Sequence, residues 1–188
     1  MIYWFQNLPL PLYNDKWEPV ITHKWLRENF MPTAYLLQFV LFVLFMIYVR
    51  GYLPKVIGSV PVVQIPINRN MSYILIIAIF IIHEILHIAV IFHKGDFSIT
   101  FSNLYIWITT NAELSKFRYF IFVFLPLLIL TVIPFIISLF FYNNLTYVIR
   151  IFAFFNLIIS SADILNTIFI LPKPNKAIFC RGMYYIKT

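Results

Sequence analysis

Four long apolar runs constrain this chain more than any other feature. They cover residues 33–49, 72–93, 118–142 and 145–171, and each is close to the roughly 20 residues that a helix needs to cross a bilayer. Hydrophobic residues make up 62% of the chain and charged residues 11%, whereas a soluble domain is about 45–50% apolar and about 25% charged. We therefore expect one integral membrane domain, an all-α polytopic protein with about four transmembrane helices.

The segments around these runs carry different signals. Residues 97–110, "FSITFSNLYIWITT", are rich in β-branched and aromatic residues, which predicts a short β-hairpin or edge strand. Residues 51–71 hold three prolines and two glycines, and we expect an extended or re-entrant loop there. Residues 20–30, "VITHKWLRENF", fit a short amphipathic helix at the membrane interface. Pro126 and Pro134 should kink the third run.

Most of the positive charge lies between the apolar runs rather than within them. The net charge is +7, and placing both termini with residues 94–117 on one side gives that side ten Lys and Arg against four on the other. The positive-inside rule then predicts cytoplasmic termini, and the composition favours a bacterial plasma membrane. No nucleic-acid-binding motif is present, so we expect no nucleic-acid partner. The single cysteine, Cys180, excludes an internal disulfide.

Ionisable residues interrupt the second apolar run in a recognisable pattern. The stretch "HEILH" is H-E-x-x-H, and on a helix His83 and His87 share one face, about one turn apart. Two imidazoles so placed can bind one metal ion, and Glu84 can take a proton from water that the metal acidifies. The alternative is that these residues make interhelical hydrogen bonds. Ionisable groups in mid-bilayer cost about 2–3 kcal/mol each, however, which exceeds what packing requires.

A zinc peptidase-like site needs a third protein ligand, and the acids inside the apolar runs are Glu84 and Asp163. On one helix, Asp163 would belong to a polar stripe with Asn156, Ser160 and Thr167. If the second and fourth runs cross in the same direction, His87 and Asp163 differ in depth by only about 3 Å. We therefore prefer Asp163 as a ligand over a role in helix packing alone. His93, at the end of its run, needs no special role.

These residues resemble a known family. The run "HEILHIAVIFHKGDFSITF", followed by "ELSKFRYFIFVFLPLLIL" and "NLIISSADIL", is similar to the small bacterial membrane proteins of the putative zincin peptidase family and to site-2 protease type intramembrane metalloproteases. The resemblance implies zinc held by His83, His87 and Asp163, with Glu84 as general base. It also implies a catalytic core within residues 72–171, and a sheet edge at 97–110 that pairs with an unwound substrate.

The chain departs from the site-2 protease pattern around the third ligand. Those proteases carry Asn-Pro-x-Asp-Gly there, whereas this chain reads Ser160-Ser161-Ala162-Asp163-Ile164. The asparagine that would help to hold a substrate or an oxyanion is missing from that motif. Asn156 or Ser160, on the same predicted face, could replace it.

The sequence thus predicts a membrane-embedded zinc metalloprotease that hydrolyses peptide bonds within or near the membrane. Its partners would be a membrane protein or peptide substrate and the lipid bilayer, and kinks at Pro126 and Pro134 could open a path for water. Two other functions stay open: a non-catalytic regulatory or scaffold protein with the same fold, and a metal-ion transporter or sensor. The sequence names neither the substrate nor the oligomeric state.

Overall fold

The computed structural model describes residues 2–4, 8, 15–59, 69–102, 105–141 and 144–187. The chain divides into two compact units, each of them discontinuous in sequence. Unit 1 comprises Met1–Asn29, Glu84–Leu125 and Asp163–Thr188, and unit 2 comprises Phe30–His83 and Pro126–Ala162. The division passes through one continuous helix, α3 (Arg69–Ile91), between His83 and Glu84.

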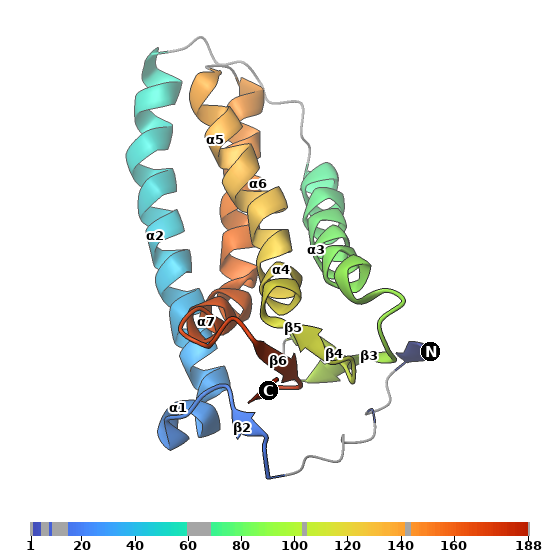
Figure 1. Cartoon of the computed structure of the whole chain (residues 1–188). Helices are drawn as coiled ribbons and strands as arrows, with labels where there is room; N and C mark the ends of the chain where they lie inside the picture. Colours follow the sequence, from blue (N-terminus) through green and yellow to red (C-terminus); the bar gives the residue numbers. More distant parts are fainter. Residues whose placement is uncertain are drawn as a thin grey trace. The chain divides into compact units, whose positions relative to one another are not determined.

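The regular elements in the described residues of unit 2 are all helices. Helix α2 (Phe30–Ser59) contacts α6 (Asn144–Ile159), and α6 in turn contacts α5 (Ile133–Phe140), as Figure 1 shows. The predicted first run, residues 33–49, lies within α2, and this helix extends beyond the run at both ends. Residues 51–59, expected in a loop, continue α2 as helix, because continuing a helix satisfies backbone groups that would otherwise lack partners in an apolar setting. Residues 60–68 of the expected loop lie outside the described part.

The third apolar run forms a helix that changes its winding twice. Helix α4 (Lys116–Leu127) passes into a π-helical turn, η1 (Leu128–Val132), and then into α5. The N–H of Ile133 donates to the carbonyl of Leu128, five residues earlier, which is the π-helical pattern. Pro126 lies at the end of α4 and Pro134 at the start of α5. The irregularity expected from the two prolines is thus present, as a π-turn between them.

The fourth apolar run differs from its prediction. Instead of one helix over residues 145–171, the structure has α6 and then α7 (Ser161–Ile170), which are bent by 62° at the break. Two serines, Ser160 and Ser161, lie at that break and are fully buried. Serine side chains compete with the backbone for hydrogen bonds and weaken a helix interior. The predicted single polar stripe is therefore wrong, because it crosses the bend.

Unit 1 contains two small sheets, so the expected all-α class is corrected to a mostly helical fold with some β-structure. The hairpin predicted at 97–110 is present as β3 (Phe97–Ser102) and β4 (Tyr105–Thr110), paired from Phe97↔Thr110 to Ser102↔Tyr105. An unpredicted strand, β1 (Ile2–Trp4), pairs in parallel with β3. Its presence leaves β4 as one edge of this sheet.

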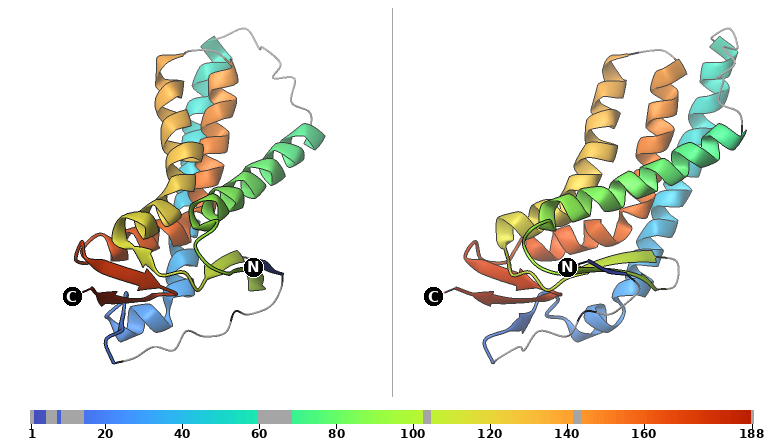
Figure 2. Two further views of the ribbon diagram at one scale, coloured as in Figure 1. Left: turned by 45° about the vertical axis from the view of Figure 1, so that its right-hand side comes forward. Right: turned by 90° about the vertical axis from the view of Figure 1, so that its right-hand side faces the viewer.

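The second sheet was not predicted. It has the order β2-β7-β6-β5, with bounds Glu18–Pro19, Met183–Ile186, Ala177–Cys180 and Leu114–Ser115 respectively. Figure 2 shows β6 and β7 as adjacent strands near the C-terminus. Arg181 and Gly182 connect them, both with positive φ (47° and 78°), which is what the tightest hairpin turns require. A short helix, α1 (Lys24–Glu28), lies within the predicted amphipathic segment.

The core of unit 1 joins these elements to the end of α3. Its buried members come from α3, α4, α7, the strands and the segments next to the strands. They are Val20, Ile91, Phe97, Ala112, Leu114, Phe122, Val123, Ile170, Ala177, Phe179 and Tyr184. Tyr119 stacks on Phe179, with ring centroids 5.1 Å apart. Because Phe97 and Phe122 share this core, the hairpin and α4 are anchored on the same apolar cluster.

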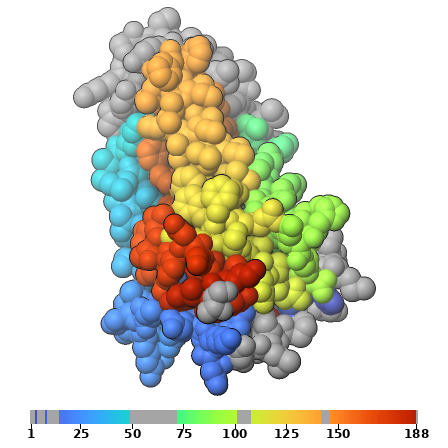
Figure 3. All heavy atoms as spheres, viewed as in Figure 1, coloured from blue at the N-terminus to red at the C-terminus, as the bar shows by residue number. Residues whose placement is uncertain are grey.

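Among the residues that the structure describes, three helical stretches are long and apolar enough to cross a membrane: Phe30–Tyr48, Ser72–Ile91 and Lys116–Phe140. The bent pair Thr146–Ile159 and Ser161–Ile170 makes a fourth if it counts as one span. Large apolar side chains on these stretches are exposed, among them Leu36 at 64% and Phe140 at 76%. Figure 3 shows atoms of α5 on the face in view, and Ile136 and Leu139 of this helix are each 49% exposed. Apolar surface of this extent suits contact with lipid chains rather than water.

Candidate metal centre

Helix α3 places both histidines of the HExxH motif on one buried face. His83 and His87 are 4% and 6% exposed, whereas Ile82 and Ile85 on the same helix are 44% and 54% exposed. The helical repeat sets residues i and i+4 one above the other, so both imidazoles point away from the exposed isoleucines. Glu84 follows His83 directly and is partly buried.

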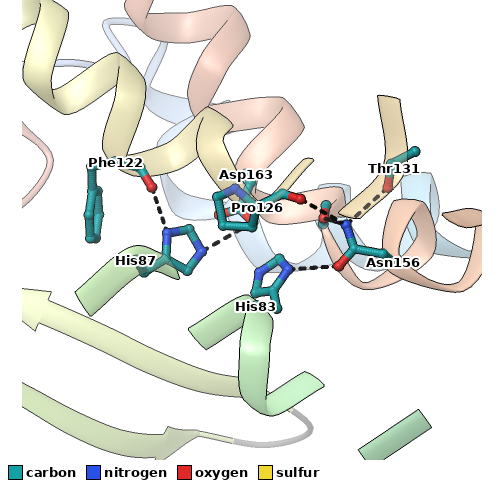
Figure 4. Close-up of polar contacts among 8 residues, drawn as sticks. His83, His87, Phe122, Pro126, Thr131, Asn156 and Asp163 are labelled. Atoms are coloured by element: carbon teal, nitrogen blue, oxygen red, sulfur yellow. Dashed lines mark hydrogen bonds and ion pairs between the residues drawn. The ribbon is translucent and has the colours of Figure 1, made fainter. Parts of the chain in front are cut away.

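The imidazole of His87 is held from both ends (Figure 4). Its Nδ1 lies 2.6 Å from the carbonyl oxygen of Phe122 in α4. A carbonyl oxygen can only accept, so Nδ1 carries a proton, and in the neutral ring Nε2 keeps its lone pair. That Nε2 lies 3.4 Å from Oδ2 of Asp163. His87 is therefore in the tautomer that can ligate a metal through Nε2.

The tautomer of His83 is determined through Asn156. The amide nitrogen Nδ2 of Asn156 donates to the carbonyl of Pro126 at 3.3 Å and to Oγ1 of Thr131 at 2.9 Å. Because the Pro126 carbonyl can only accept, the amide oxygen of Asn156 is turned toward His83, whose Nδ1 lies 3.0 Å away. Nδ1 of His83 therefore donates, and in the neutral ring its Nε2 also keeps a lone pair.

The break after α6 determines where Asp163 lies. Asp163 belongs to the first turn of α7, where a negative charge is favoured by the unpaired N–H groups of the helix start. Its side chain is 15% exposed. Had the fourth run been one straight helix, Asp163 would continue the direction of α6 instead of opening a new helix.

The ligand atoms of His83, His87 and Asp163 all lie within 4.8 Å of one another. Two atoms that each lie about 2.0–2.1 Å from a tetrahedral zinc are about 3.4 Å apart, and this matches the 3.4 Å between His87 Nε2 and Asp163 Oδ2. Two imidazoles and one carboxylate are also donors that zinc accepts, and three protein ligands leave a fourth position for water or substrate. The residues present therefore fit zinc.

The other residues named from the sequence lie as follows. Asn156 and Ser160 are fully buried, with Nδ2 of Asn156 3.4 Å from Oγ of Ser160. Their predicted contact with an oxyanion stays a prediction. His93 is exposed beyond the end of α3, with φ of 65° and its ring against Phe92, and it does not join the cluster of ligand atoms.

Sequence reasoning missed three groups that position the histidines: the carbonyls of Phe122 and Pro126, and the hydroxyl of Thr131. Backbone carbonyls carry no residue-type signal of their own. A proline inside a helix does give one, since it leaves the carbonyl four residues earlier without its usual donor.

The fold and the site together define a class: a mostly helical protein with membrane-length helices and a possible His/His/Asp metal site on an HExxH helix. Residues 76–178, more than half of the chain, match the family described as "Putative zincin peptidase", and the chain belongs to that family. Neither the comparison with curated proteins nor the comparison with solved structures found a match.

Proposed function

We propose that this protein is a membrane-embedded zinc metallopeptidase that hydrolyses peptide bonds within or near the membrane. The observation that carries the proposal is the arrangement of the two imidazoles. Each uses Nδ1 for a hydrogen bond, and the ligand atoms of both lie with a carboxylate oxygen in one small cluster. Membership of the zincin family supports the same conclusion.

In this proposal His83, His87 and Asp163 hold the zinc. When bound, zinc would polarise the scissile carbonyl and lower the pKa of the attacking water. Glu84, adjacent to the first histidine, takes the proton from that water and passes it to the leaving amine. The hydrogen bonds to Phe122 and Asn156 keep both imidazole rings oriented throughout the reaction.

The sheet that follows α3 offers a place for an extended substrate. β3 is paired on both sides, by β1 and β4, whereas β4 pairs only with β3 in the part of the chain that the structure describes. A peptide strand could therefore add to the open edge of β4 through main-chain hydrogen bonds. We propose a membrane protein or peptide as substrate, a bacterial plasma membrane as location and cytoplasmic termini, the last from the distribution of Lys and Arg.

The first experiment is elemental analysis of zinc in protein purified in detergent without chelator. Wild type should contain about one zinc per chain, and His83→Ala and Asp163→Ala should each lose it. His93→Ala is the matched control, since it removes a histidine from the same segment but not from the cluster. A wild-type protein without zinc would contradict the proposal.

The second experiment separates metal binding from catalysis. Glu84→Gln should keep zinc but lose peptidase activity toward membrane-protein substrates, because the amide cannot take a proton from water. Activity at the wild-type rate in Glu84→Gln would contradict the role of general base. A phenotype that survives this substitution in cells would instead favour a non-catalytic regulatory protein.

A further inference from the structure

The carbonyl that orients His87 lies four residues before a proline. In a regular helix the carbonyl of Phe122 would accept from the N–H of residue 126, but Pro126 has no N–H. His87 donates to this carbonyl through Nδ1 at 2.6 Å. The imidazole thus takes the place of the missing helix donor. Pro126 itself is fully buried.

The same irregular segment also holds the partners of His83. Asn156 contacts the carbonyl of Pro126 and the hydroxyl of Thr131, and Thr131 lies in the π-turn η1. Thr131 in turn donates through Oγ1 to the carbonyl of Ala153 at 3.1 Å. Its hydroxyl proton is therefore used, and Oγ1 accepts from Asn156. This chain of bonds leaves the amide oxygen of Asn156 facing His83.

We infer that Pro126 is a positioning residue for the metal ligands, and that the departure from regular helix in the third run holds both histidines in their metal-binding tautomer. Pro126 supplies the acceptor for His87 through the Phe122 carbonyl, and Asn156 with Thr131 supplies the acceptor for His83. This inference rests on the proposed metal function. Pro126 thereby has a role beyond a kink that admits water. It leaves the Phe122 carbonyl without a helix donor, so that His87 can donate to that carbonyl.

The chain contains a matched control in Pro134. It lies eight residues further along the same run and also lacks an N–H, but it sits in the first turn of α5, where Pro is well tolerated. The carbonyl four residues before it belongs to Leu130, within η1. The hydrogen bonds that orient His83 and His87 are made to Asn156 and to the Phe122 carbonyl, respectively, and not to Leu130.

The test compares wild type, Pro126→Ala and Pro134→Ala in the full chain. A backbone N–H at position 126 would compete with His87 for the Phe122 carbonyl. We therefore expect NMR of the metal-free, histidine-labelled protein to show His87 shifting from its Nδ1–H tautomer in Pro126→Ala alone. Zinc affinity, measured by competition with a chelating dye, should fall by about 10–100-fold in that variant, as is typical when an outer partner of a metal ligand is removed.

The opposite result is equally clear. If the histidine tautomers and the zinc affinity are the same in Pro126→Ala as in Pro134→Ala, the inference is wrong. If wild type has the Nδ1–H tautomers but binds no zinc, the proposed metal function fails while the orienting contacts stand. The NMR measurement therefore distinguishes the two failures.

Asn156→Leu tests the second half of the inference without altering the proline. It removes the acceptor of His83, and we expect a loss of zinc affinity of the same order, about 10–100-fold, with the tautomer change confined to His83. Thr131→Val removes the hydroxyl that contacts Asn156 and Ala153 and should produce a smaller loss, because the acceptor of His83 itself stays in place. An unchanged His83 tautomer in Asn156→Leu would overturn the assignment of Asn156.

Discussion

Two polar clusters are buried among the apolar helices, and they differ in how their hydrogen bonds are used. In one, His83 and His87 lie near Asp163. In the other, Arg150 of α6 is 9% exposed and donates to Ser138 of α5, from Nε to Oγ at 3.0 Å and from Nη2 to the carbonyl at 2.7 Å. Ser138 also donates to the carbonyl of Phe135.

The contrast shows that burial of polar groups alone does not mark a functional site. Arg150 bonds to Ser138 two residues before the end of α5, where a cation beside the terminal carbonyls stabilises the helix. Its contacts therefore have a structural explanation. Each histidine instead uses one nitrogen for orientation, and the ligand atoms of three residues gather in one place. That convergence distinguishes the site from the structural cluster.

The largest expected effect comes from removing the negative charge of Asp163, the third candidate ligand. Asp163→Asn keeps the size of the side chain but removes its negative charge, and we expect zinc affinity to fall by more than the ~100-fold that marks the upper range for outer partners. Isothermal titration of the metal-free protein in detergent would measure it. Unchanged affinity would mean that Asp163 only pairs with His87, as Arg150 pairs with Ser138.

Arg150→Met should have the complementary effect. It leaves the carbonyl and hydroxyl of Ser138 without their charged donor, which typically costs about 1–3 kcal/mol of stability. Thermal unfolding in detergent should therefore shift downward, while the zinc content stays at the wild-type level. Loss of zinc from a folded Arg150→Met protein would show that the two clusters are coupled and would break the comparison.

An exposed polar contact gives the smallest expected effect. The Tyr185 hydroxyl donates to Glu113 at 3.0 Å, and this hydrogen bond, more than the partial burial of the ring, raises the pKa of Tyr185 above its usual value. A raised folded-state pKa means that the contact stabilises the protein below about pH 10, the unfolded tyrosine value, and is lost as pH rises through the raised pKa.

Glu113→Gln should therefore return the pKa of Tyr185 toward the ordinary tyrosine value, as followed by absorbance titration. Tyr184 donates to Glu18 instead, at 2.7 Å, and its raised pKa should stay unchanged in this variant. Zinc content should also be unaffected. A shift of Tyr184 together with Tyr185 would contradict this assignment of partners.

Some of this architecture follows from the sequence, because helix geometry is nearly invariant. The spacing of His83 and His87 predicts one face whatever surrounds the helix, and the apolar runs predict helices of membrane length. The hairpin at 97–110 follows from its β-branched and aromatic residues. These features depend on local repeats, which a single sequence displays directly.

Other features depend on contacts that local patterns do not encode. The bend at Ser160 interrupts a run whose hydrophobicity continues through it, so apolar length alone predicts one helix. The strands β6 and β7 have four residues each, and their hairpin turn at Arg181–Gly182 was not recognised in the sequence. The oxyanion contact expected of Asn156 or Ser160 stays a prediction, but the sequence did not indicate that the amide oxygen of Asn156 lies beside His83. Only the fold brings those two residues together.

The bend at Ser160 has a consequence for the lipid around the protein. Helix α6 has 16 residues and so a length of about 24 Å, whereas the hydrocarbon core of a bilayer is about 30 Å thick. If α6 crosses the membrane without α7, the bilayer beside it should thin locally, which carries a modest cost for each ångström of mismatch. Headgroups and water would then approach Ser160 and Asp163 from the lipid side. Reconstitution in lipids with longer acyl chains should therefore slow peptide hydrolysis, and equal rates in thin and thick bilayers would argue against such thinning.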